Sequence, residues 1–216
     1  MTDREKIISA FMELLGEEPI EDIGLADVAA RSGVSLAQMR GEFSSIMSIL
    51  AASVKDTDRR VLAGGEDMLE EPVRERLFDV LMRRLEILTP HKKAIRSLMG
   101  SALRNPPLAL ALNGLGTRSM HWMMTAAGIK TKGPKGMARA QGLSLLFGRV
   151  VSIWVDDEDP GLARTMAALD RELSRGERWS GFLDDLFCIP EALLRARSFR
   201  GRRRRPDDEG LSSPLP

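Results

Sequence analysis

Hydrophobic side chains recur at steps of three and four residues along most of this chain, which is the spacing of one buried face on an α-helix. The first such stretch predicts a helix over residues 3–16, because Thr2 and Glu5 match a capping box at its start and Gly16 can end it. Its apolar positions are Ile7, Ile8, Phe11, Leu14 and Leu15. We expect this helix to cover the two helices that follow it.

The segment DVAARSGVSLAQMRGEF, residues 27–43, predicts two short helices joined by a tight turn. Gly33 can adopt the left-handed backbone conformation that closes a helix, so the first helix is expected to end there. Ser35 matches an N-cap and Gln38 its capping-box partner, so the second helix is expected to begin at Leu36. This is the arrangement of a helix-turn-helix, which lays its second helix in the major groove of DNA, although a plain corner between two helices gives the same pattern.

The remaining periodic stretches are helical as well, so the sequence predicts an all-α fold. A fourth helix is expected from about residue 46 to Gly64-Gly65, and a fifth between Pro72 and Pro90. Proline and glycine then separate helices expected over residues 91–104, 107–127, 135–155, 160–175 and 179–187. No run alternates between apolar and polar residues, as a half-buried strand would.

Three segments are expected along the chain: a helix-turn-helix domain over residues 1–50, a helical bundle over 51–199 and a disordered tail over 200–216. Seven arginines fall within residues 195–205, and the polar, proline-rich stretch after them cannot bury a core. These arginines can be a solvated end, or a polybasic arm that attracts phosphate or anionic lipid.

Composition narrows the classes of function. A single cysteine, Cys188, excludes an internal disulfide, and two histidines provide no metal-ligand cluster of recognisable spacing. The sequence has no phosphate-binding glycine loop, no nucleophile elbow and no acid-base set, so we expect neither an enzyme nor a cofactor. It has no signal peptide and no apolar run long enough to span a membrane, which predicts a cytoplasmic protein without stable membrane insertion.

The helix expected over residues 107–127 is rich in methionine at its centre, and large apolar side chains also share a face of the helix expected over 135–155. Such side chains can line a cavity for a flexible apolar ligand, fill a core or form the seam of a homodimer. His121 beside Arg118 can meet an acidic group of a ligand. The candidate ligand-binding residues are Met99, Arg118, His121, Trp122, Met123, Phe147 and Trp154.

Two other polar features are expected to be solvated or to serve as caps. His91 follows Pro90 in the first turn of a helix, beside two lysines, where it is expected to face solvent. In the acidic run over residues 156–159, Asp159 is expected to cap the next helix and the three acids before it to be solvated. The run lacks the ligand spacing and the glycine of a calcium loop.

Residues 4–50 resemble the DNA-binding domain of TetR-type transcriptional regulators. The resemblance lies in REKIISAFMELL, IGLADVAARSGVS, Phe43 and the SS-x-x-x-x-L boundary to the next helix. It implies an N-terminal domain that binds double-stranded DNA as a homodimer, and a C-terminal bundle that holds a small apolar effector and the dimer interface. The expected function is that of a ligand-responsive repressor.

By position, the resemblance implies that the second helix of the motif presents Ser35, Leu36, Ala37, Gln38 and Arg40 to DNA. Gln38 suits bidentate contact with adenine, Arg40 suits guanine or a phosphate, and Ala37 leaves room for a thymine methyl group. Ser44 and Ser45 would donate to a phosphate at the start of the fourth helix.

A second interpretation stays open because residues 1–50 carry nine acidic side chains against four basic ones, an unfavourable balance for a polyanionic partner. The stretch RERLFDVLMRRLEILTPHKKAIRSL and the later W-x-x-D-x-x-P before TMAALDREL are similar to TetR-fold lipid-binding accessory proteins of ubiquinone biosynthesis. That similarity implies a protein that binds a lipid or isoprenoid and whose helix-turn-helix does not read DNA.

Overall fold

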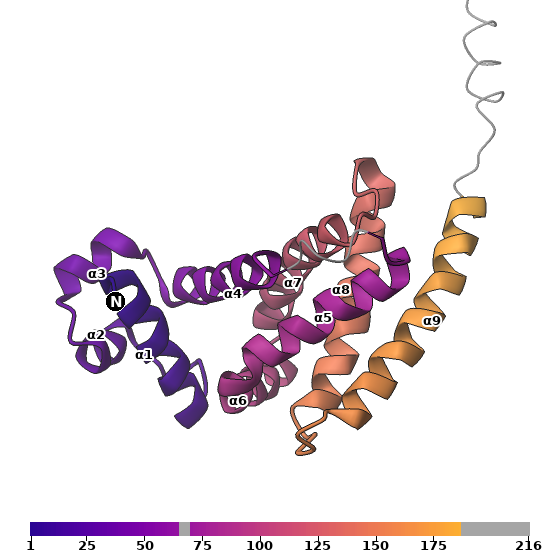
Figure 1. The fold of residues 1–216 in the computed structure, drawn as a ribbon. Coiled ribbons are helices and arrows are strands. Elements are labelled where there is room, and N and C mark those ends of the chain that lie inside the picture. The colour runs from indigo at the N-terminus through magenta and orange to yellow at the C-terminus, as the bar shows by residue number, and fades with distance from the viewer. Residues whose placement is uncertain (65–69, 187–216) are drawn as a thin grey trace, which may run out of the picture. The chain divides into compact units, whose positions relative to one another are not determined.

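A computed structural model describes residues 1–64 and 70–186 of the chain. Their regular structure is helical throughout (Figure 1), which confirms the predicted all-α fold. One compact unit, Met1–Glu177, contains all the described helices except the end of the last one, which lies in a second unit that begins at Arg178. Cys188 and the predicted tail over residues 200–216 lie outside the described residues.

Local capping interactions define the three N-terminal helices. These are α1 (Asp3–Glu17), α2 (Leu25–Ser32) and α3 (Leu36–Glu42). At the start of α1, the Thr2 side chain accepts from the Glu5 amide and the Glu5 carboxylate accepts from the Thr2 amide. Gly33 has a φ of 66° between α2 and α3, the left-handed conformation that the sequence predicts there. The helices of the motif therefore begin and end where their caps predict.

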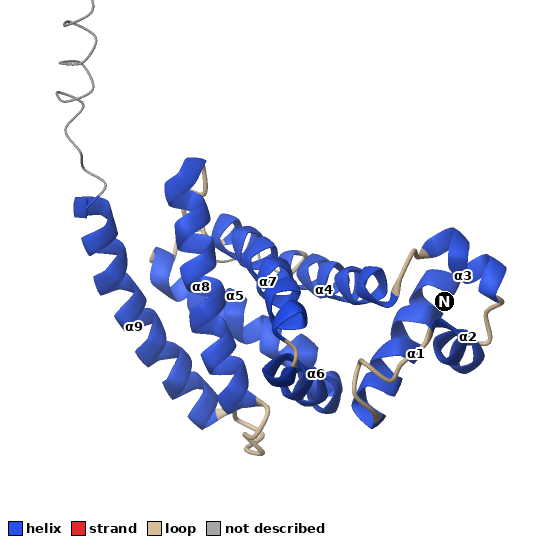
Figure 2. Cartoon of the chain, turned by 180° about the vertical axis from the view of Figure 1, so that it is seen from behind, coloured by secondary structure: helices blue, strands red, loops and turns tan. Residues whose placement is uncertain are grey.

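The first core lies beneath α1, which contacts both α2 and α3 as predicted (Figure 2). Its fully buried side chains include Ile7, Phe11, Leu15, Val28 and Ile49. Burial of each contributes about 1.5–3 kcal/mol, and together these contacts fix the helix-turn-helix on α1. The fourth helix, α4 (Ile46–Leu62), contributes Ile49 to this core and Val61 to a second one.

The second core is formed by Val61 of α4 together with helices that follow α4. They are α5 (Val73–Leu88), the 3-10 turn η2 (Thr89–His91), α6 (Lys92–Arg104), α7 (Pro106–Ala126), α8 (Gly133–Trp154) and α9 (Ala163–Leu186). α7 and α8 pack side by side (Figure 2). Fully buried side chains of this core include Leu81, Leu85, Met123, Trp154 and Leu169. Within the described ranges, no helix is both long enough and apolar enough to cross a bilayer.

α9 differs from the prediction because it runs without interruption through Gly176, where the sequence predicts a break between two helices. A single glycine inside a helix costs about 1 kcal/mol relative to alanine, which is not enough to end the helix. The expectation of separate helices over residues 160–175 and 179–187 is therefore wrong.

The connection between α8 and α9 is built around Asp157, which is only 1% exposed. The expectation that Asp157 is solvated is therefore wrong. Its carboxylate accepts from the amide and the hydroxyl of Thr165, at 2.9 and 2.6 Å, and the bond from the Thr165 side chain lowers the pKa of Asp157. Asp159 caps α9 as predicted, since its side chain accepts from the Ala163 amide at 3.0 Å. Lys92 donates to the Asp157 carbonyl group at 2.5 Å and so joins this connection to α6.

Candidate nucleic-acid interface and ligand cavity

α3 has one side on the first core and its other side open to solvent. Within Leu36–Glu42, Met39 is the buried side chain, at 2% exposed, and it anchors the helix. The predicted DNA-facing residues of this helix are exposed, namely Leu36, Ala37, Gln38 and Arg40. Leu36 keeps 59% of its surface in solvent although it is apolar. This face can therefore approach another molecule without rearrangement of the core.

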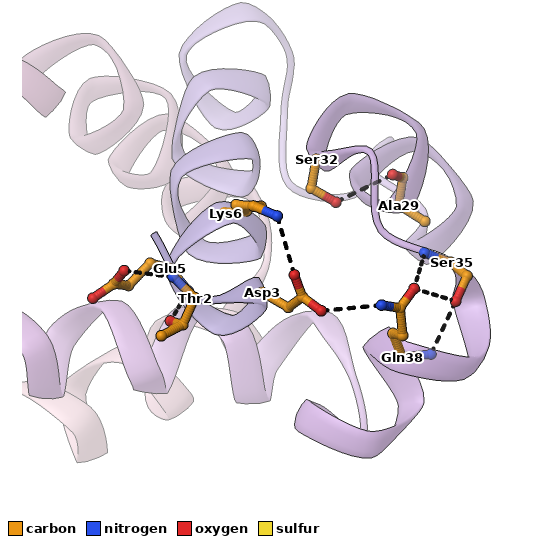
Figure 3. A network of polar contacts seen from close by, with 8 residues as sticks. All are labelled: Thr2, Asp3, Glu5, Lys6, Ala29, Ser32, Ser35 and Gln38. Carbon is orange, nitrogen blue, oxygen red and sulfur yellow. Dashed lines mark hydrogen bonds and ion pairs between the residues drawn. The ribbon is translucent and has the colours of Figure 1, made fainter.

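Ser35 and Gln38 form the predicted capping box of α3, and their hydrogen bonds continue to α1 (Figure 3). The Gln38 Oε1 atom accepts from the Ser35 amide at 3.1 Å and from the Ser35 hydroxyl at 2.6 Å. The Gln38 Nε2 atom donates to Asp3 at 3.1 Å, and Asp3 also accepts from Lys6 at 3.2 Å. Both ends of the Gln38 amide are thus engaged, so a bidentate contact with adenine requires these bonds to open first.

Other cations near the motif are also engaged within the protein. Arg31 donates two hydrogen bonds of 2.8 Å to Glu17, and these bonds lower the pKa of the Glu17 carboxyl group. The Arg4 guanidinium group lies over the Phe43 ring, 5.0 Å from its centroid. Arg40, by contrast, has no hydrogen bond or ion pair with any described residue, so its charge is available to a partner.

α4 begins with a further capping interaction, in which the Ser45 side chain accepts from the Ser48 amide at 3.2 Å. The Ser48 hydroxyl accepts in turn from the amides of Ser44 and Ser45, at 3.1 and 3.0 Å. Ser44 and Ser45 are exposed at the start of a 17-residue helix, where the helix dipole favours an anion. Because both amides are already bonded and the Ser45 side chain caps the helix, the Ser44 hydroxyl is the donor that remains for a phosphate among these groups.

A cavity of about 1170 Å³ is lined by α1, α4 and the helices from α5 to α8. Its wall is mainly apolar and combines side chains that pack on the first core with others that pack on the second. Two of the predicted ligand-binding residues line it, Met99 from α6 and Phe147 from α8. The structure therefore brings together one part of the predicted ligand site.

The other predicted ligand-binding residues do not line this cavity, namely Arg118, His121, Trp122, Met123 and Trp154. Successive residues of a helix point about 100° apart, so neighbours in sequence cannot all face one cavity. On α7, Met120 reaches the cavity wall, Met123 is fully buried in the second core and Trp122 is 53% exposed. Trp154 is fully buried in the second core as well.

A buried polar network beside the cavity is not predicted from the sequence. Arg84 of α5 pairs with Asp58 of α4, and Ser119 of α7 donates to the same carboxylate oxygen at 2.6 Å. Arg84 follows Leu81 by three residues and precedes Leu88 by four, so helical spacing alone places it on the buried face. Its charge conceals this signal, because arginine is usually exposed unless a partner is buried with it.

His91 is half-buried on the cavity wall, so the expectation that it faces solvent is wrong. Burial lowers its pKa and the charge of Arg60 lowers it further, whereas Glu13 acts in the opposite direction. The imidazole ring is therefore mainly neutral at pH 7. In the part of the chain that the structure describes, no three His, Cys, Asp or Glu side chains gather as a metal site would require.

Comparison with solved structures identifies the fold. The chain is similar to a TetR transcriptional regulator from Nitrosomonas europaea, with 23% identity, a TM-score of 0.64, and coverage of 82% of this chain and 99% of that one. A TetR transcriptional regulator from Rhodococcus sp. RHA1 is 19% identical, with a TM-score of 0.56 and coverage of 81% and 95%. A tetR-family transcriptional regulator from Streptomyces coelicolor is 14% identical, with a TM-score of 0.54 and coverage of 94% and 100%. No protein-family model and no curated protein matches the chain. The similarity to these solved structures establishes a TetR-like fold, as predicted.

Proposed function

We propose that this protein is a DNA-binding regulator of transcription that acts as a homodimer. Residues 1–50 are the proposed DNA-binding domain, and the helical bundle after them is the proposed domain for ligand binding and dimerisation. The observation that carries the proposal is the exposed outer face of α3, held in place by Met39 on its inner face. The names of the similar solved structures support it. The activity needs no catalytic step or cofactor, and it belongs in the cytoplasm with the DNA.

α3 offers both charged and apolar contacts to a major groove. Arg40 carries a free guanidinium group, which can bond guanine or a phosphate. Leu36 and Ala37 are exposed apolar side chains that suit the methyl group of thymine. The Ser44 hydroxyl at the start of α4 adds a donor for the DNA backbone.

The proposed homodimer places two copies of α3 in successive major grooves, about 34 Å apart. Large apolar side chains that remain exposed on the bundle support self-association, namely Leu110 and Trp122 on α7 and Met137 and Leu145 on α8. Sedimentation equilibrium at micromolar concentration checks this part of the proposal, since the dimer has twice the 23.9 kDa mass of one chain.

The proposed output is repression that a small apolar ligand relieves. The cavity wall includes side chains of α1 and α4, the two helices that carry the helix-turn-helix, so an occupant would contact the elements that position α3. Release requires the ligand to bind the DNA-free state more tightly than the DNA-bound state. A ligand with equal affinity for both states would leave the DNA occupied.

Binding to the DNA that flanks its own gene tests the proposal, by fluorescence anisotropy at several salt concentrations. Arg40→Ala should weaken binding by about 1–3 kcal/mol, because it removes the free guanidinium group of α3. Lys135→Ala removes the same charge from an exposed position on α8 and should leave binding unchanged. Equal effects of the two variants would exclude Arg40 from the interface.

Asp3→Ala is expected to strengthen DNA binding. The substitution removes a negative charge beside α3 and releases both Lys6 and Gln38 from their bonds to Asp3. If Lys6 then neutralises a phosphate, the slope of log affinity against log salt should steepen by about one unit. Asp22→Ala removes an exposed acid from the loop before α2 and should not alter that slope. An unchanged slope for Asp3→Ala would mean that Lys6 does not reach DNA.

A lipid-binding function without DNA recognition is the second candidate. The engagement of Lys6 and Arg31 with neighbouring acids favours it, because these cations are then not free for phosphates. So does the size of the cavity, which exceeds the roughly 300–1000 Å³ of most small-molecule sites. The absence of any saturable DNA binding at low salt would favour this candidate over the regulator.

A further inference from the structure

The cavity wall contains aliphatic side chains that face inward and yet remain half-buried. Ile8, Leu98 and Leu112 pack on the first core, and Ile87, Met99 and Val151 pack on the second. Each of these side chains also lines the cavity, so each would lose further contact with water if an apolar molecule lay between the two cores. The occupant must be apolar over most of its length.

The charged side chains of the wall differ in how fully they are paired. The charge of Arg84 is neutralised by Asp58, and the Arg59 guanidinium group lies 3.8 Å from the Asp56 carboxylate. Arg60 lines the cavity but has no hydrogen bond or ion pair within residues 1–64 and 70–176. Among the described residues of the wall, Arg60 is therefore the cation that can pair with a bound ligand.

His91 lines the same cavity as Arg60, and the charge of Arg60 adds to the lowering of the His91 pKa by burial. Glu13 of α1 acts on the same ring with the opposite sign. A neutral imidazole beside a free guanidinium can add a hydrogen bond to an anionic group without adding a second desolvated charge. Arg60 and His91 thus form a site for the polar end of a molecule whose remainder is apolar.

We propose that the ligand of this cavity is an unbranched fatty acid, whose carboxylate pairs with Arg60 beside His91 and whose chain lies between the two cores. A cavity of about 1170 Å³ has room for a long chain, whereas a compact ring would fill only part of it. The inference deepens the proposed ligand response by naming the class of ligand, and it rests on that cavity being the effector site.

Calorimetric titration of the full chain with decanoate, dodecanoate and 1-decanol tests the proposal in the absence of DNA. Dodecanoate should bind roughly tenfold more tightly than decanoate, since each buried methylene strengthens binding about three- to fourfold. Because Arg60 is exposed, Arg60→Ala should weaken decanoate binding about three- to fivefold and 1-decanol binding less than twofold, since the guanidinium pairs with the charge of the carboxylate but only donates to a neutral hydroxyl. Arg59→Ala is the matched control and should change either ligand less than twofold. Equal affinities of the wild-type protein for decanoate and 1-decanol, or equal effects of the two variants, would overturn the proposal.

Histidine NMR tests where the carboxylate of the bound ligand lies. The chain has two histidines, so the ring signals of His91 and His121 can be followed separately. A bound carboxylate should raise the pKa of His91, because an adjacent negative charge favours the imidazolium form, and the ring signals of His121, which does not line the cavity, should not move. Binding of dodecanoate without this shift would contradict the placement of the carboxylate. Fatty acid binding without DNA binding would defeat the proposed regulation alone, and DNA binding without fatty acid binding would defeat this inference alone.

Discussion

Replacing Asp58 with alanine is expected to lower the free energy of unfolding by about 3–5 kcal/mol. Asp58 is 8% exposed, and it accepts from both Arg84, itself 6% exposed, and Ser119. Without this carboxylate, the Arg84 guanidinium stays buried with no countercharge, and its desolvation is no longer compensated. Urea denaturation followed by circular dichroism measures the loss.

Asp79→Ala is the matched control, because Asp79 pairs with Arg83 one turn apart on the same helix, α5. That pair is more exposed, so its loss should cost no more than about 1 kcal/mol. The double variant Asp58→Leu, Arg84→Met should recover much of the stability, since it replaces a buried ion pair with apolar side chains. An effect of Asp58→Ala no larger than that of Asp79→Ala would show that water reaches Arg84.

The helix boundaries near the N-terminus could be predicted because the interactions that set them are local. Thr2 with Glu5 and Ser35 with Gln38 are partners three residues apart, and Gly33 needs only its own φ to end α2. Such signals depend on no distant contact. The uninterrupted course of α9 is harder to predict, because the glycine signal at position 176 competes with helical propensity on both sides.

The candidate site could be predicted only as far as it lies on one helix. The residues that the family resemblance places on the outer face of α3 are exposed, and Met39 between them is buried. The bond from Gln38 to Asp3 joins residues 35 positions apart, and the network of Asp58 with Ser119 joins residues 61 positions apart. Neither follows from spacing, because both depend on how α1, α4 and α7 pack.

The apolar residues of the ligand site likewise could be predicted only in part. Methionine and tryptophan cluster on α7, but sequence alone does not decide which turn of that helix faces the cavity and which faces the core. The packing places Met120 on the cavity wall and Trp122 outside. His91 lies on the wall at the end of the 3-10 turn η2, whereas the sequence pattern predicts it as the first residue of a helix that faces solvent.

Replacing Trp154 with alanine is expected to lower the free energy of unfolding by about 3–5 kcal/mol. The ring is fully buried in the second core, and the Lys92 ammonium group lies 5.1 Å from its centroid. Alanine would leave a cavity at the end of α8 and would remove the ring face that Lys92 contacts. Since Lys92 also donates to the Asp157 carbonyl group, the connection to α9 should loosen. Urea denaturation measures the change, and faster amide exchange in residues 155–162 would report the loosening.

Trp154→Phe should be far milder, with a change below about 1.5 kcal/mol. The indole Nε1 atom is buried without an acceptor among the described residues, so tryptophan carries an unsatisfied donor at this position. Phenylalanine keeps an aromatic face for Lys92 and removes that donor, and the gain offsets part of the packing lost with the smaller ring. If Trp154→Phe were as destabilising as Trp154→Ala, the indole N–H would have to bond to a group that becomes accessible in solution, and the aromatic face alone would not account for the role of Trp154.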